Sequence, residues 1–93
     1  MDVRFIEDNK RGALGAVFCV NDEWYFADIV YLPYPYDCNE CMIFKSDEHG
    51  NVTDWSDQYC NRDPELTISK ESMLTCIREF CDCGYYEDEE ELD

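Results

Sequence analysis

The sequence predicts an α+β fold, in which a small antiparallel β-sheet of four to five strands has one C-terminal helix packed on it. Three observations support this prediction: aromatic and β-branched runs alternate with short polar turns, residues 40–55 have the pattern of a β-hairpin, and residues 70–82 place apolar side chains at helical spacing. The chain has 93 residues, 45% of them hydrophobic, which is enough to bury one core but not two. We therefore expect a single acidic domain over residues 1–86 and a flexible acidic tail over residues 87–93.

The first three strands are predicted from the N-terminal third of the chain. Residues 3–6 (VRFI) form a short strand that we expect at a sheet edge. Residues 14–20 (LGAVFCV) are apolar at both alternating sets of positions, which is typical of a central strand covered on both faces. After a polar turn at residues 21–23, the segment 24–32 (WYFADIVYL) predicts a long strand that pairs with the preceding one.

Residues 40–55 (ECMIFKSDEHGNVTDW) give the strongest local signal in the chain. The apolar run 41–44 predicts one strand, and 52–55 predicts its partner. Between them, 47–51 (DEHGN) contains turn-forming residues, with Gly50 able to adopt a positive φ. This hairpin organises the predicted sheet.

A helix is predicted near the C-terminus. The polar stretch 56–65, which contains Pro64, is interpreted as an irregular connection with at most a brief strand extension. Ser69 is the expected N-cap of a helix over 70–82, and Gly84 is the expected C′ residue. One helical face is apolar, so it requires the sheet as a packing surface; its residues are Met73, Leu74, Ile77, Phe80 and Cys81.

The charge of the chain restricts its partners. The net charge is −16, and subtracting the six acids of residues 87–93 still leaves −10. A field of this sign repels nucleic acid and anionic membranes and attracts basic surfaces, including the grooves in which proteins hold phosphate backbones. The alternative is that the charge serves only solubility. Because no apolar run approaches the ~20 residues of a membrane span and no secretory signal pattern is present, we predict a cytoplasmic protein without a membrane partner.

Acids and tyrosines in turns and at strand ends are the predicted partner-binding residues. Rigid amphipathic rings anchor protein interfaces while surrounding charges steer association. Tyr34 and Tyr36 lie on a loop bordered by Pro33 and Pro35 and are therefore expected to be exposed. The full predicted set comprises Asp22, Glu23, Tyr34, Tyr36, Asp37, Glu40, Asp47, Glu48, Asp54 and Asp57.

The seven cysteines are expected to be reduced thiols, because an odd number does not fit a closed disulfide framework. Cys38 and Cys41 have the C-x-x-C spacing of a zinc-binding turn, and Cys81 and Cys83 could supply a second pair of ligands. The C-x-C spacing of the second pair and the place of Cys81 on the predicted core face argue against zinc. We predict a chain without a cofactor, with these four cysteines as the weak candidates for metal ligands.

No catalytic pattern occurs in the sequence. His49 is the only histidine, and it lies in the predicted hairpin turn, where a solvated side chain is the usual role. Nucleophile elbows, zinc-protease motifs and phosphate-binding loops are all missing from the sequence. We therefore predict that the protein is not an enzyme.

Residues 40–83 resemble small acidic proteins carried by phages and mobile elements of Gram-positive bacteria. The resemblance rests on a Glu-x-Met-hydrophobic-Phe run, an Asp-Glu-x-Gly-x-Val turn and an Asp-Trp, at Glu40, Met42, Ile43, Phe44, Asp47, Glu48, Gly50, Val52, Asp54 and Trp55. Cys41 departs from the pattern, where Thr is common. The resemblance implies a fold element and no functional residue.

Small acidic proteins of mobile elements include the anti-CRISPR and anti-restriction inhibitors, and this analogy of class agrees with the charge. The function predicted from the sequence is inhibition of a nucleic-acid-handling host defence protein, such as a CRISPR effector nuclease, by acidic DNA mimicry at its DNA or guide site. The alternatives are an antidote or immunity protein for a basic toxin, a small zinc-binding adaptor, and a phage protein of unrelated role.

Overall fold

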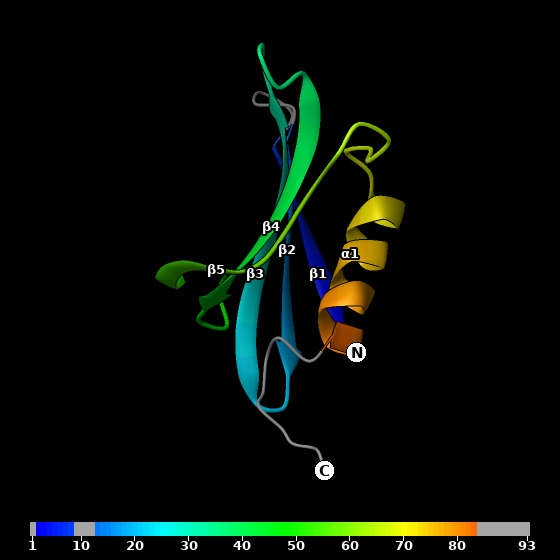
Figure 1. Ribbon diagram of the computed structural model, residues 1–93. Helices are drawn as coiled ribbons and strands as arrows, with labels where there is room; N and C mark the ends of the chain where they lie inside the picture. Colours follow the sequence, from blue (N-terminus) through cyan, green and yellow to red (C-terminus); the bar gives the residue numbers. More distant parts are fainter. Residues whose placement is uncertain (1, 9–12, 84–93) are drawn as a thin grey trace.

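The computed structural model describes residues 2–8 and 13–83, which form one antiparallel sheet and one helix (Figure 1). The sheet order is β1-β2-β3-β4-β5, so each strand pairs with its neighbour in sequence. The predicted fold class is confirmed. The elements are β1 (Val3–Asp8), β2 (Ala13–Val20), β3 (Glu23–Leu32), β4 (Cys38–Ser46), β5 (Val52–Asp63) and α1 (Lys70–Cys83).

Two tight turns fix the register of the central strands. Val20 pairs with Glu23, so β2 and β3 are joined by Asn21 and Asp22 alone, with φ of 52° and 67°. Asn and Asp tolerate this left-handed region, which a two-residue turn of this type requires. In the β4–β5 turn, Gly50 has a φ of 90°, as its position in the sequence predicted.

Strand β5 is longer than the sequence indicated, and the expected irregular connection over residues 56–65 is wrong up to Asp63. Lys45 pairs with Asp54 whereas Ile43 pairs with Tyr59, so residues 55–58 all lie opposite Phe44. This wide bulge interrupts the two-residue alternation of a regular strand. The strand therefore resumes beyond the bulge without the periodic pattern that would have predicted it.

Helix α1 packs on one face of the sheet, termed here the helix face (Figure 1). Phe80 contacts the rings of Tyr25 and Tyr59 at centroid distances of 5.1 and 6.3 Å. Met73 and Ile77 are also buried, as predicted, whereas Leu74 is 37% exposed. The helix-face core is completed by Leu14, Ala16, Phe18, Ala27, Ile29, Cys41, Ile43 and Cys76.

The start of the helix agrees with the predicted cap. The Ser72 amide donates to Ser69 Oγ at 3.2 Å, and the Met73 amide donates to the Ser69 carbonyl at 3.0 Å. The first bond caps an amide that has no partner within the helix, and the second is the first backbone bond of the helix itself. The predicted C′ residue, Gly84, and the predicted tail lie outside the described residues.

The opposite side of the sheet, termed here the open face, is partly covered by the β4–β5 turn. Arg4 Nη2 donates to the Glu48 carbonyl at 3.0 Å, which ties the turn to β1. A Cβ atom on Gly50 would lie 2.8 Å from Val17 Cγ2, so the backbone of the turn rests directly on that side chain. Val17 is consequently only 1% exposed, and β2 is covered on both faces as its sequence predicted.

Candidate protein-binding surface

An apolar groove of about 340 Å³ lies on the open face beside the β4–β5 turn. Ile6 of β1 pairs with Gly15 of β2, and Gly15 pairs with Asp28 of β3. These three residues therefore form a row across the open face. The residues that line it are Ile6, Ala13, Gly15, Phe26, Asp28, Phe44 and Trp55. We refer to this set as the open-face groove.

Gly15 shapes the floor of the groove. A Cβ at this position would approach Phe26 Cε1 to 3.0 Å, a distance that forces the ring to move. Without a side chain at Gly15, the Phe26 ring lies against the β2 backbone. Any larger residue at position 15 would therefore displace the Phe26 ring and change the shape of the groove.

Trp55 forms a wall of the groove and is its most exposed ring. It is 73% exposed and meets Phe44 edge-on, with 5.2 Å between the ring centroids and 62° between the ring planes. Phe44, in contrast, is only 7% exposed. Because Trp55 lies in the β5 bulge, its position is fixed by a departure from strand geometry and not by the pleat.

Two aspartates, Asp54 and Asp57, flank Trp55 in the sequence. Asp54 accepts a hydrogen bond from the Ser56 amide at 2.9 Å, and this backbone bond holds the pKa of Asp54 below its usual value. Asp57 is exposed on the same bulge. Asp54 and Asp57 therefore add negative charge to the segment of β5 that contains Trp55.

The β4–β5 turn contributes further acids. The amides of His49 and Asn51 both donate to Asp47 Oδ1 at 2.9 Å, and the pKa of Asp47 is lowered, first by the Asn51 backbone bond. Glu48 is exposed beside it. The ionised Asp47 side chain thus stabilises the turn that lies over the open face.

The β2–β3 turn lies next to the β4–β5 turn, because Trp24 pairs with Ser46. Lys45 Nζ is 3.8 Å from Glu23 Oε1 across these strands. The structure thus gathers six of the ten predicted partner-binding residues at one end of the sheet, termed here the acidic end: Asp22, Glu23, Asp47, Glu48, Asp54 and Asp57.

The remaining predicted tyrosines and Asp37 lie at the other end, in the loop between β3 and β4 (Figure 1). Tyr34 is 91% exposed, whereas the ring of Tyr36 is covered in part by the Arg62 guanidinium, 5.0 Å from its centroid. Tyr31, near the end of β3, is 51% exposed and donates a hydrogen bond to Asp37. Strand β3 has ten residues, so roughly 30 Å separate this loop from the acidic end.

Glu40 does not belong to the exposed acids. It is 7% exposed on the open face and accepts hydrogen bonds from Arg62 Nε at 3.2 Å and Nη2 at 2.9 Å. The Cys60 thiol also donates to Glu40 at 3.3 Å. Because its charge is already compensated within the fold, Glu40 contributes little to the external field.

Cys38 and Cys41, the residues of the C-x-x-C pair, lie on opposite faces of the sheet. Cys41 lies three positions after Cys38 along β4, so the two side chains point to opposite faces. Cys41 is fully buried towards α1. Cys81 is half-buried against the core, and the Cys83 side chain lies outside the described part. Among the described residues, no group of three or more His, Cys, Asp or Glu side chains could hold a metal ion.

Comparison of the chain with protein-family models, with curated proteins and with solved structures found no match. In the part of the chain that the structure describes, no helix is long and apolar enough to cross a membrane.

The groove itself was not predicted from the sequence. The sequence places Trp55 in the predicted strand 52–55 and in the pattern of the resemblance, although a tryptophan within the polar run TDWSDQ is also a signal of an exposed ring. Ile6 and Phe26 were assigned to strands without a face. Their convergence depends on the register and on the bulge, neither of which the local pattern contains.

Proposed function

We propose that the chain is a non-enzymatic inhibitor that binds a basic, nucleic-acid-binding surface of a host defence protein, such as a CRISPR effector nuclease, in the bacterial cytoplasm. Its open-face groove and acidic end make the contact. The bound carboxylates take the place of the phosphate groups that the partner normally holds. The observation that supports this proposal most directly is the exposed Trp55 at the edge of an apolar groove within an acidic segment.

The aromatic part of the surface accounts for affinity. Tryptophan is enriched among the residues that dominate binding energy, because burial of its large rigid ring costs little conformational entropy. Trp55 meets Phe44 edge-on, and this contact supports one side of its ring before binding.

The charged part of the surface accounts for the kind of partner. Of the cations near the acidic end, Arg4 contacts the carbonyl of Glu48 and Lys45 lies near Glu23 at 3.8 Å, a distance at which a surface pair contributes little. The negative field of the acidic end therefore remains, and it favours encounter with lysine- and arginine-rich surfaces.

The test is a DNA-binding and cleavage assay with purified, RNA-loaded CRISPR effector nucleases and restriction endonucleases as probes. We expect at least one of them to lose DNA binding in proportion to the bound chain, and to recover it as added salt screens the contact. A nuclease that binds the chain while holding its DNA normally would contradict mimicry, as would inhibition that is independent of salt.

Two triple variants separate the acidic end from the overall charge. The first removes three exposed charges of the acidic end and leaves Asp47 and Asp54, which accept backbone hydrogen bonds, intact: Asp22→Asn, Glu48→Gln and Asp57→Asn. Asparagine also tolerates the positive φ at position 22. We expect this variant to lose most of its inhibition.

The matched control makes the same change in net charge on the helix side of the sheet, with Glu7→Gln, Glu65→Gln and Glu71→Gln. Glu7 lies 3.9 Å from Lys70 in a surface ion pair, whose loss has little effect on stability. The control should inhibit nearly as well as the unmodified chain. Equal loss in both variants would mean that net charge, and not the acidic end, determines binding.

A further inference from the structure

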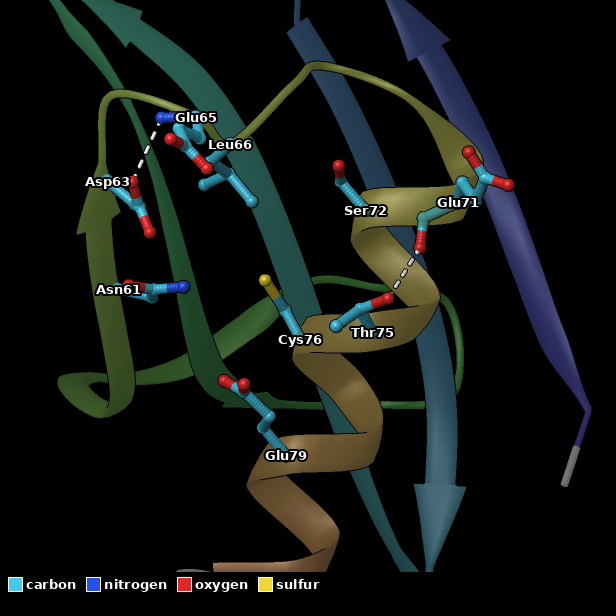
Figure 2. A pocket seen from close by; sticks show the side chains of 9 residues that line it. All are labelled: Asn61, Asp63, Glu65, Leu66, Glu71, Ser72, Thr75, Cys76 and Glu79. Atoms are coloured by element: carbon cyan, nitrogen blue, oxygen red, sulfur yellow. Dashed lines mark hydrogen bonds between the residues drawn. The ribbon is translucent and has the colours of Figure 1, made fainter.

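A second cavity, of about 390 Å³, lies between the C-terminal part of β5 and helix α1, on the side of the sheet opposite the open-face groove (Figure 2). Cys76 of α1 lines its inner wall, with its sulfur pointing towards the Asn61 side chain across the cavity (Figure 2). Cys76 is 1% exposed at the molecular surface. A small molecule can therefore approach this sulfur only from the cavity that Cys76 lines.

Cys41 of β4 is the neighbour of this sulfur inside the core. It is fully buried, and its thiol is hydrogen-bonded to Cys76. The sequence separates the two residues by more than thirty positions, and the packing of α1 on the sheet brings them together. Two thiols in direct contact, one of them at a cavity, form the arrangement that reversible disulfide chemistry requires.

The surroundings favour the thiolate form at Cys76. The Cys41 thiol and the Asn61 amide donate to it, and the Cys41 hydrogen bond contributes most to lowering the pKa of Cys76. Burial of the sulfur and the charge of Glu79 raise the pKa of Cys76 and so partly oppose this effect. The Tyr59 hydroxyl has a single proton, which it donates to Glu79 Oε1 at 2.6 Å, so we do not count it among the donors to the sulfur.

The surroundings of Cys41 favour the protonated thiol. Its hydrogen bond to Cys76 and its burial raise the pKa of Cys41, so this thiol keeps its proton. It also lies away from the cavity, in the layer between β4 and α1. The two cysteines therefore have different roles: Cys76 lines the cavity and is the nucleophile, and Cys41 keeps its proton and lies deeper in the core.

We propose that Cys76 is a hydroperoxide-reactive thiol and that Cys41 resolves its oxidised form, which yields a reversible disulfide between helix α1 and strand β4. This modification site goes beyond the proposed binding function and does not depend on it. The substrate is hydrogen peroxide or a small organic hydroperoxide that enters the cavity.

The reaction consumes one hydroperoxide for each disulfide. The Cys76 thiolate attacks the terminal peroxide oxygen, a sulfur–oxygen bond forms as the oxygen–oxygen bond breaks, and the released hydroxide or alkoxide takes a proton from solvent and leaves as water or, from an organic hydroperoxide, as an alcohol. The sulfur is oxidised by two electrons to a sulfenic acid. Cys41 then attacks this sulfur, the sulfur–oxygen bond breaks, and the hydroxide leaves with the Cys41 proton as water.

Exposure alone would predict a different reactive cysteine. Cys60 is exposed, but burial of its sulfur and its hydrogen bond to the Glu40 carboxylate raise the pKa of Cys60 to about 11. At neutral pH this thiol is almost entirely protonated and slow to react. Cys76 should therefore react with peroxide before the more exposed Cys60.

Tryptic mapping of the full chain tests this order. The chain is treated with a small molar excess of hydrogen peroxide, the remaining thiols are alkylated, and the digest is analysed with and without reduction. Cleavage at Lys and Arg leaves Cys76 as the sole cysteine of peptide 71–78, while Cys60 lies in peptide 46–62. We expect a disulfide between peptides 71–78 and 12–45, located at Cys41 by fragmentation, with the loss of two hydrogen atoms and reversal by dithiothreitol.

Two single-residue variants test the roles proposed for Cys76 and Cys41. In Cys41→Ser the disulfide cannot form, so Cys76 should accumulate as a sulfenic acid that dimedone traps. In Cys60→Ser, the matched control, the disulfide should form at the rate of the unmodified chain. First oxidation at Cys60, a disulfide of Cys76 with another cysteine, or no oxidation of peptide 71–78 under conditions that oxidise the other cysteines would each overturn the proposal. Mapping of the unmodified chain distinguishes these outcomes even if a variant fails to fold.

Discussion

Trp55 stands edge-on against Phe44 across the β4–β5 pair, with 5.2 Å between the ring centroids, and the two rings differ tenfold in exposure, at 73% and 7%. The same contact thus joins an inner ring that belongs to the fold and an outer ring available to a partner. Mutation of the two residues should separate stability from binding.

Trp55→Ala should lower affinity for the partner and leave the fold intact. The loss of an exposed anchoring ring is expected to cost about 2 kcal/mol of binding free energy, or roughly 30-fold in Kd. The free energy of unfolding should change little, because most of the ring is already in water. Calorimetric titration of the partner and denaturant unfolding measure the two quantities.

Phe44→Ala is the matched change at the inner ring. It removes a buried aromatic side chain, so the free energy of unfolding should fall by about 3 kcal/mol. A Trp55→Ala chain that unfolded as easily as Phe44→Ala would show that the outer ring is structural. Unchanged affinity in Trp55→Ala would remove it from the binding surface.

The sequence predicted the sheet and the helix because their signals are local. Alternating apolar residues, the turn at Gly50 and the cap at Ser69 each act within a few positions, and all appear in the structure. The bulge at residues 55–58 was not predicted, since it has no periodicity of its own. It is also the feature that places Trp55 over the groove.

The two candidate sites depend on contacts between distant parts of the chain. Cys41 was considered only as the partner of Cys38, at C-x-x-C spacing, because the sequence does not show that a strand turns these side chains to opposite faces. Its actual neighbour is Cys76. Likewise, the closeness of the two acidic turns follows from the pairing of Trp24 with Ser46, which the turn residues alone do not reveal.

Ile77→Asp should unfold the domain. Ile77 is 3% exposed between α1 and the sheet, and an unpaired buried carboxylate costs several kcal/mol, comparable to the ~5–15 kcal/mol total stability of a small domain. Circular dichroism on heating should show loss of the cooperative transition. Thr75→Asp, at an exposed position of the same helix, should keep the transition; if both behaved alike, the packing face of α1 would be wrong.

Glu40→Gln should make Cys60 more reactive. Burial of the Cys60 sulfur is the first cause of its raised pKa of about 11, and the hydrogen bond to Glu40 is the second. Removal of the carboxylate charge should lower this pKa towards, but not to, the ordinary thiol value. The midpoint of the pH profile for alkylation of peptide 46–62 by iodoacetamide should therefore shift to lower pH.

The control for this shift is Glu65→Gln, which removes a carboxylate from the helix side of the sheet. It should leave the alkylation profile of Cys60 unchanged. An equal shift in both variants would indicate a general effect of net charge, and no shift in Glu40→Gln would mean that burial alone controls the thiol.

Asp47 should make the β4–β5 turn sensitive to acid. The folded pKa of Asp47 lies below the ordinary value of 3.8, first because the Asn51 amide donates to the carboxylate and also because Asn51 Nδ2 donates to Oδ2 at 3.1 Å. A lowered pKa in the folded state means that the ionised side chain stabilises the fold above the unfolded value of about 4. This stability should be lost as the pH falls through the folded pKa.

Asp47→Asn isolates this contribution, because it keeps an oxygen that can accept from the His49 and Asn51 amides and removes the titration. The unmodified chain should lose more of its unfolding free energy between pH 7 and pH 2 than Asp47→Asn, as measured by the urea midpoint at each pH. Asp57→Asn removes the same charge from an exposed position on the bulge and should follow the unmodified chain. If Asp47→Asn lost stability with pH as steeply as the unmodified chain, the acid sensitivity would have to arise from carboxylates outside this turn.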